Sequence, residues 1–247
     1  MPYFSGQGNV YVATASAGVP GVFRHVGNCP ILNVQLETDV LEHKEATSGQ
    51  RLTDLRIIRG KTAKFSFTIE EFEKKNLALA LYGADSSVAS GSVVAEAFPT
   101  VAVGDFVKTA KQKLSAIVVK DSAGTPATLT LNTHYEVTSA DHGTIKFINL
   151  ASFTQPFKID YSHAVVTNVN MFTQGFTDRW LKFDGLNTVD TNKACLIELF
   201  KCSFDPASQI DFINDDIMKF ELNGAALYDS TKAADTVLGQ FGRLILT

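Results

Sequence analysis

The sequence predicts a mainly β protein organised around a long hairpin near residues 31 to 69. Its 247 residues are 45% hydrophobic and include 18 phenylalanines, a residue that suits pleated, half-buried surfaces. Several runs alternate apolar and polar residues, as half-buried strands do, and only one segment has a convincing helical pattern. The length suits one large β-domain, or a smaller domain that carries an inserted subdomain.

The first half of the hairpin follows a short opening strand, near residues 9 to 13, and a turn that contains Gly and Pro. The run ILNVQLETDVL, residues 31 to 41, alternates with a period of two. Its apolar side chains are Leu32, Val34, Leu36 and Val40, and its polar side chains are Asn33, Gln35, Glu37 and Asp39. We expect the apolar set to build the core and the polar set to face water.

The second half is TAKFSFTI, residues 62 to 69. Its apolar set is Ala63, Phe65, Phe67 and Ile69, and its polar set is Thr62, Lys64, Ser66 and Thr68. The two runs match faces only where paired residue numbers sum to an odd value, because a slip of one residue turns a whole face outward. A sum near 99 places Gln35 opposite Lys64 and Glu37 diagonal to it. Gly60 is a candidate for a bulge or a close backbone approach.

Residues 42 to 56, EHKEATSGQRLTDLR, are predicted to be a long polar loop. Hairpin connections usually have two to five residues, so a longer one is generally functional or disordered. A plain surface loop is one interpretation, and an arm that orders against another subunit is the one we favour. The candidate inter-subunit residues are Glu42, His43, Lys44, Glu45, Thr47, Ser48, Gly49, Gln50, Arg51, Leu52, Asp54 and Arg56.

One helix is predicted over about residues 70 to 82. Thr68 and Glu71 fit a capping box, and Gly83 fits a C-cap. The apolar stripe contains Phe72, Leu77, Ala80 and Leu81, which would cover a sheet.

The rest of the chain divides by pattern. Residues 84 to 104 are rich in small residues and are expected to be a linker that ends in a possible strand. Residues 111 to 164 hold short, closely spaced strand signals, so we expect an extra small β-module there, inserted or fused into the main sheet. Residues 1 to 110 and 165 to 247 would form the main β core, with strands at 180–185, 194–204 and 218–224 and a possible terminal strand.

Composition excludes several function classes. The net charge of −4 argues against a protein that binds nucleic acid by neutralising phosphates. Neither a signal peptide nor a membrane-spanning run is expected. Cys29, Cys195 and Cys202 are expected to be free, mostly buried thiols, which points to assembly in a cytoplasm.

Motifs of catalysis are absent from the sequence, including nucleophile elbows, phosphate-binding loops and zinc signatures. His134 and His142, with Asp141 nearby, lack a further ligand to close a metal site. Asp215 and Asp216 are neighbours that would point apart on a strand. The sequence therefore predicts a protein that is not an enzyme and has no metal or cofactor.

Three stretches in this order resemble the major tail tube proteins of siphophages, which have long non-contractile tails. The first is LETDVLEHKEATSGQRLTDLRIIRGKTAKFSFTIEEFEKKNLALALYG, residues 36 to 83. The second is RWLKFDGLNTVDTNKACLIELFKCSFDPASQIDFINDD, residues 179 to 216. The third is MKFELNGAALYD, residues 218 to 229. Together they cover well over a third of the chain.

The resemblance implies a tail-tube-type β-sandwich flanked by one helix, with six copies in a ring and rings stacked into a hollow tube. Such a subunit is part of the virion, assembles in the host cytoplasm, and conducts double-stranded DNA without binding it specifically. Its implied partners are itself and the tape measure, tail terminator and tail tip proteins. The candidate lumen-facing residues are Asn33, Gln35, Glu37, Asp39, Lys64, Ser66 and Thr68.

Two other classes stay open. A carbohydrate-binding or adhesin β-module of a tail tip would need exposed aromatic platforms, whereas the single tryptophan, Trp180, is expected in the core. A β-sandwich hydrolase would need a catalytic constellation, and the residues do not single one out.

Overall fold

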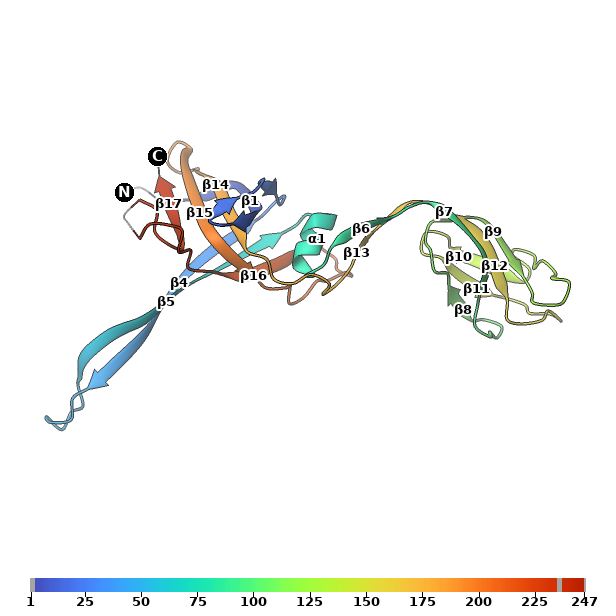
Figure 1. The fold of residues 1–247 in the computed structure, drawn as a ribbon, viewed down its shortest axis with the longest axis horizontal. Helices are drawn as coiled ribbons and strands as arrows, with labels where there is room; N and C mark the ends of the chain where they lie inside the picture. The colour runs from blue at the N-terminus through green and yellow to red at the C-terminus, as the bar shows by residue number, and fades with distance from the viewer. Residues whose placement is uncertain (1–2, 235–236, 247) are drawn as a thin grey trace. The chain divides into compact units, whose positions relative to one another are not determined.

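The computed structural model describes residues 3–234 and 237–246, and it is mainly β (Figure 1). The chain forms two compact units. Unit 1 comprises residues 1–84 and 169–247, and unit 2 comprises residues 85–168. The mainly β fold class predicted from the alternating runs is therefore confirmed.

Unit 1 contains one sheet of nine strands and one short helix. Its elements are β1 (Gly6–Ser16), β2 (Val19–Pro20), β3 (Arg24–His25), β4 (Ile31–Lys44), β5 (Thr53–Ile69), α1 (Lys74–Ala80), β14 (Arg179–Asn187), β15 (Lys193–Phe204), β16 (Phe220–Ala226) and β17 (Gly242–Leu246). The strand order is β2-β1-β14-β15-β16-β5-β4, with β17 also paired to β15 and β3 to β1. The strands of this sheet pair antiparallel.

The core of unit 1 joins strands that are far apart in this order. Val12 of β1, Phe67 of β5 and Leu222 of β16 belong to one buried cluster, together with Leu79 of α1. A flat sheet could not bring β1 and β5, which lie near its opposite ends, to the same cluster, so the sheet curves over on itself. A smaller cluster, centred on Trp180 and Phe200, lies apart from this core.

The hairpin pairs in a register with an odd sum of residue numbers, as the alternation of both runs predicts. From Ile31 to Asp39 the paired residue numbers sum to 99, so that Leu32 faces Phe67. The register shifts directly after the Asp39–Gly60 pair, which is the position at which a bulge was expected. The strands extend further than predicted, because β4 continues to Lys44 and β5 begins at Thr53. The predicted loop of residues 42–56 is therefore wrong at both ends, and the connection spans only 45–52.

The helix is shorter than predicted. It begins at Lys74, with Glu73 as an N-cap residue that makes no side-chain cap hydrogen bond. The expected capping box is absent because Thr68 is held in β5, where it pairs with both Ile31 and Glu221. At the other end the Gly83 N–H donates to the Ala78 carbonyl, but Tyr82 is the residue with positive φ.

Unit 2 is a separate β structure with its own core. Its elements are β6 (Asp85–Val88), β7 (Gly91–Ala97), β8 (Phe106–Lys108), β9 (Leu114–Lys120), β10 (Tyr135–Ser139), β11 (Thr144–Phe147), β12 (Lys158–His163) and β13 (Val166–Val169). The sheets β10-β11-β8 and β7-β12-β9 enclose one cluster that includes Phe147, Phe157 and Ile159, while β6 pairs with β13.

The boundary of the insertion differs from the predicted range of 111–164. The unit begins at Asp85 because β7, in the segment expected to be a linker, pairs with β12 over residues 91–97. The pattern did not predict β7, because Gly, Ser and Ala are weak strand signals on their own.

Candidate functional site

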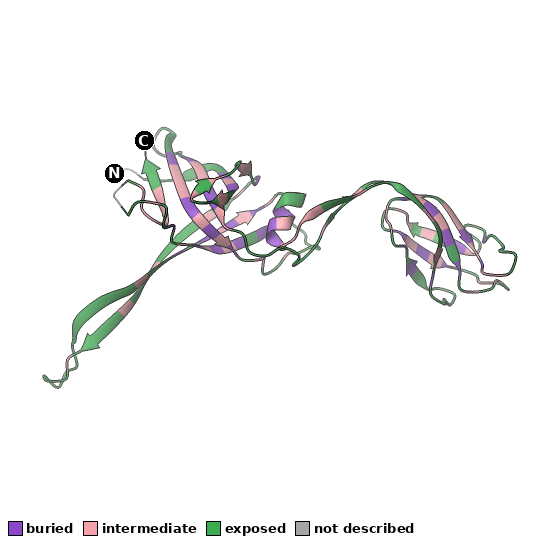
Figure 2. Cartoon of the chain, in the orientation of Figure 1, coloured by how far each residue is buried: buried purple, intermediate pink, exposed green. Residues whose placement is uncertain are grey.

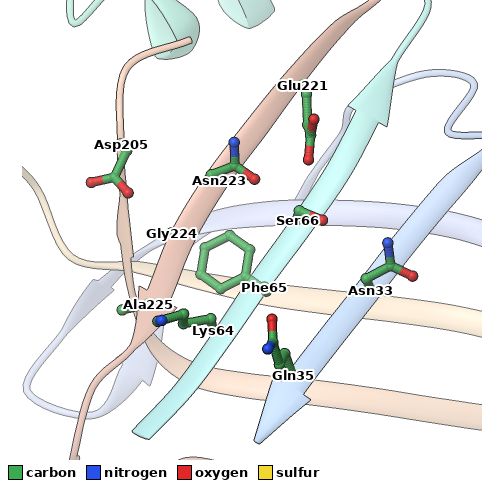
Figure 3. Close-up of a pocket in the computed structure, with 10 residues that line it drawn as sticks. All are labelled: Asn33, Gln35, Lys64, Phe65, Ser66, Asp205, Glu221, Asn223, Gly224 and Ala225. Carbon is green, nitrogen blue, oxygen red and sulfur yellow. The ribbon is translucent and has the colours of Figure 1, made fainter. Parts of the chain in front are cut away.

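A polar surface covers one face of β4, β5 and β16. Register sets each row across the three strands. Ser66 of β5 lies between Asn33 and Asn223, and Lys64 of β5 lies between Gln35 and Ala225. These side chains line a shallow hollow of about 450 Å³ (Figure 3). The opposite face of β5 carries Phe65 and Phe67, which are buried. Alternation along the strands thus separates a polar surface from the core.

The seven candidate lumen-facing residues occupy this polar face. The β4 members are Asn33, Gln35, Glu37 and Asp39, and the β5 members are Lys64, Ser66 and Thr68. All are exposed or half-buried. Sequence reasoning missed the contribution of β16, because the strand that follows β5 in a sheet cannot be read from local pattern. The alternation of Glu221 and Asn223 with Leu222 was the available signal.

Carboxylates outnumber cations on this face. The Lys64 ammonium lies 2.9 Å from Glu37, as the predicted diagonal pair requires, and the Arg59 guanidinium lies 3.1 Å from Asp39. Asp205 and Glu221 add two further carboxylates beside the hollow. A surface with this balance repels phosphate weakly and does not neutralise it.

The predicted core is wrong for the apolar face of β4, which is largely exposed. Leu32 packs against the core only in part, and Val34 and Leu36 are exposed, Leu36 to 78%. The reason is position, since β4 is the last strand of the sheet and nothing described pairs with its outer edge. The outer edge of β4 thus presents backbone N–H and C=O groups that no described strand pairs with, together with exposed apolar side chains.

Beyond the bulge the hairpin continues as a two-stranded arm, which we define as residues 40–58. The predicted inter-subunit residues all lie on it: Glu42, His43 and Lys44 in β4, residues 45–52 in the connection, and Asp54 and Arg56 in β5. Both strands of the arm are exposed along most of their length (Figure 2). The arm therefore pairs only with itself within the described chain.

The tip of the arm is ordered by one carboxylate. Glu45 accepts hydrogen bonds from the backbone N–H groups of Thr47 (2.6 Å) and Ser48 (2.8 Å), and from both hydroxyls. These donors, led by Ser48, lower the pKa of Glu45 to about 2. These hydrogen bonds define the local turn of the connection.

Within residues 3–234 and 237–246, no three His, Cys, Asp or Glu side chains gather as metal ligands would. His134 instead accepts from the Thr130 N–H, and His142 contacts Ser139. No helix in the described part of the chain is long and apolar enough to cross a membrane.

The cysteines have the predicted state. All three are free, with Cys195 and Cys202 buried and Cys29 half-buried. Burial, with help from nearby Glu70 and Glu71, raises the pKa of the Cys29 thiol to about 12. A thiol in that environment is a poor nucleophile.

The chain matches the model of a known protein family. A family model described as "Protein of unknown function UCP028589" matches residues 3–245. The search of curated proteins found no match.

Proposed function

Because the chain belongs to this family over nearly its whole length, and the family description carries no activity, we propose a function from the residues themselves. We propose that the protein is a structural, non-catalytic subunit of a phage tail tube. In this proposal six copies close into a ring, and stacked rings form a hollow virion tube that conducts DNA. The observation that most supports it is the polar face of β4, β5 and β16. This face lies over a buried core, and it ends at β4, whose outer edge pairs with no described strand.

The polar face supports the role of a lumen wall. DNA must slide through such a channel, so the wall has to be hydrated and must not bind phosphate. The neutral row of Asn33, Ser66 and Asn223 provides hydration, and the excess of carboxylates around it opposes phosphate binding. The net charge of −4 has the same sign.

The open edge supports closure into a ring. A long regular edge strand that bears exposed Leu36 would invite uncontrolled pairing in a monomer. Closing the sheet across subunits removes that edge and covers Val34 and Leu36 together. Tape measure, terminator and tail tip proteins would then meet the completed tube.

Negative-stain electron microscopy of the purified protein tests the proposal. We expect rings or tubes to form as the protein is concentrated, and we expect double-stranded DNA not to be retained by them at physiological salt. A variant that lacks residues Thr47–Leu52 should stay folded and fail to polymerise. A strictly monomeric particle at high concentration would contradict the proposal.

No specific observation in the described residues favours the glycan-binding alternative. Trp180 is 5% exposed and packs against Phe200, so it offers no platform to a sugar ring. A glycan array that bound the protein while microscopy showed no tubes would reverse this preference.

A further inference from the structure

One arginine of unit 1, Arg179 at the start of β14, is half-buried and lacks a partner among the described residues. Within residues 3–234 and 237–246 its guanidinium makes no hydrogen bond and no ion pair. A guanidinium carries five N–H donors and keeps its charge, so a partly buried one is normally paired. Burial and the nearby Arg24 both lower the pKa of Arg179. The charge is therefore held in place without an acceptor.

Register places a second guanidinium on the same side of the sheet. Arg24 of β3 pairs with Val12 of β1, and Arg179 of β14 pairs with Thr14, two residues further along β1. Paired strand residues share a face, as do residues two apart on one strand, so both arginines project from the face that carries the buried Val12. Arg24 is fixed there, because it donates at 2.6 Å to the side-chain oxygen of the buried Asn76 of α1.

The C-terminal end of α1 does not provide the missing acceptor. Its last carbonyl groups, and that of the next residue but one, already accept hydrogen bonds from backbone N–H groups. These donor–acceptor pairs are Gly83–Ala78, Ala207–Ala80, Phe172–Leu81 and Thr173–Tyr82. Since backbone donors satisfy this end of the helix, Arg179 is not required to cap it.

The carboxylates near the two arginines are engaged elsewhere. Asp178 directly precedes Arg179 in the chain, but it pairs with Lys201 at 3.3 Å. Glu73 acts on Arg24, where it opposes the fall in pKa that burial causes. Both carboxylates therefore leave Arg179 without an acceptor in the described part of the chain.

The unpaired guanidinium borders a small hollow of about 80 Å³ beside the end of α1. Tyr82 and Gly83 line it from the helix side, and Gln174 and Thr177 line it from the segment that leads into β14. The Gln174 amide and the Thr177 hydroxyl are hydrogen-bond donors on exposed side chains. A water molecule needs about 10–15 Å³ of such space, so the hollow has room for a small oxyanion.

We infer that this hollow is an oxyanion site, in which Arg179 binds a carboxylate or phosphate group and Arg24 adds positive potential from across β1. The planar fork of an arginine matches these groups because it can hold two of their oxygens at once. A bound oxyanion supplies the acceptor that Arg179 lacks in the described chain and offsets the repulsion between the two guanidiniums. The site lies on the core side of the sheet, beside Leu79 of the core cluster, and so it is separate from the polar face of β4, β5 and β16.

Thermal unfolding in different salts tests the site. Trp180 is the only tryptophan, and its fluorescence reports the unfolding of unit 1. Phosphate also stabilises folded proteins by exclusion from their surfaces, so the informative quantity is the difference between wild type and Arg179→Met. Replacing chloride by phosphate at equal ionic strength should raise the Tm of the wild type by about 3 °C more than that of Arg179→Met, because a ligand of the folded state stabilises it.

Acetate in place of phosphate distinguishes the two sources of the oxyanion. A larger specific shift in phosphate assigns a phosphate group. An equal or larger shift in acetate assigns a carboxylate, such as one from another protein chain. Equal responses of wild type and Arg179→Met to both anions would overturn the inference. The measurement does not require assembly, so its failure would leave the proposed function standing.

Two arginine variants separate binding from a purely structural role. Arg51→Met, at an exposed arginine that has no partner in the described chain, is the matched control and should keep the wild-type response. In chloride alone, Arg179→Met should melt at the wild-type temperature or above it, because a partly buried charge without a partner costs stability. A Tm of Arg179→Met clearly below that of the wild type in chloride would show that Arg179 holds the fold, and would count against the site.

Hydrogen exchange locates the bound ion. The more effective of the two anions should slow the exchange of backbone amides in residues 174–179 of the wild type. Residues 139–143, a turn of unit 2, are the internal control and should be unchanged. Slowing that is confined to segments outside 82–83 and 174–179 would overturn the assignment to this hollow.

Discussion

The edge strands of the β7-β12-β9 sheet in unit 2 are interrupted, whereas the edge strand β4 of unit 1 is regular from Ile31 to Asp39. Both β7 and β9 shift register where they pass Asp160 and Tyr161 of the central strand β12. Ala95 and Ala116 lie at these shifts with φ near 55° and 50°, values that non-glycine residues seldom adopt. In contrast, β4 pairs with β5 from Ile31 to Asp39 without a break.

The difference indicates where the chain is built to associate. Bulges twist an edge away and spoil it as a template for another strand, so unit 2 is protected on both sides of its β7-β12-β9 sheet. The strain at these bulges is held by specific contacts, such as the Ala95 N–H that donates to Asp160 at 2.7 Å. An edge as open as β4 has no such protection. We therefore expect self-association to use the β4 edge of unit 1 and not the β7 or β9 edge of unit 2.

The largest expected effect compares two matched positions. Leu36 on β4 is 78% exposed and Val94 on β7 is 77% exposed, so lysine at either position should leave the monomer folded. Leu36→Lys should abolish assembly, because a charge on an open edge blocks strand addition. Val94→Lys should assemble like the wild type. Sedimentation and microscopy of both variants measure this difference. Equal assembly of the two variants would contradict the contrast between the β4 and β7 edges.

The next effect tests whether the two units are independent. Phe147 is fully buried in the core of unit 2, and Phe147→Ala should destabilise that unit by about 3–5 kcal/mol. The only tryptophan, Trp180, lies in unit 1 and reports its unfolding by fluorescence. In a denaturant titration the circular dichroism transition should split or move down, while the fluorescence transition stays in place. A joint shift of both signals would show that the units unfold together.

A smaller effect concerns the contact that holds one bulge. Asp160 accepts from the Ala95 N–H and lies 2.7 Å from the Lys120 ammonium. Asp160→Ala should cost unit 2 about 0.5–1.5 kcal/mol, because it removes the acceptor of the Ala95 N–H, which is exposed and can bond to water instead. Asp141→Ala, in an exposed turn, is the control and should be near neutral.

The same carboxylate predicts a pH dependence. Hydrogen bonds from Lys120 and Ala95 lower the pKa of Asp160 in the folded state below its unfolded value of about 4. The stabilisation is therefore complete above that unfolded value, and it is lost as the pH falls through the lower folded pKa. Melting curves of Asp160→Asn should show a weaker acid dependence than those of the wild type, and equal slopes would count against this role.

The smallest effect concerns the tip of the arm. Glu45→Gln removes a charged acceptor of the Thr47 and Ser48 N–H groups but leaves the core untouched. Global stability should not change, while hydrogen exchange at Thr47 and Ser48 should accelerate. Gln50→Ala is the control within the same connection. Unchanged exchange in Glu45→Gln would show that the loop is ordered by other contacts.

The sequence predicted those features that depend on alternation. The parity of residue numbers fixed the faces of β4 and β5, and so Phe65 and Phe67 were correctly expected inside. It could not reveal that β4 ends the sheet, which is why Val34 and Leu36 were wrongly expected to be buried. The helix start was also mispredicted, because Thr68 lies in β5 between two strand neighbours and does not cap the helix.

Only the β4 and β5 part of the candidate site could be predicted from the sequence. Its β4 and β5 residues follow from local pattern, whereas Asn223 and Glu221 enter only through the pairing of β16 with β5. That pairing joins segments separated by most of the chain, so no local signal specifies it. The strand in residues 91–97 was missed because its small residues gain their order from β12.

The pairing of β6 with β13 has a consequence for how this chain can vary. The segment between them, residues 89–165, leaves and re-enters through two strands that already lie side by side. A short turn could join those strands directly, with no change of register elsewhere, since closing a short loop between adjacent ends costs little. Residues 89–165 could therefore be replaced by an unrelated domain whose termini lie close together, with β6 and β13 kept as the connection.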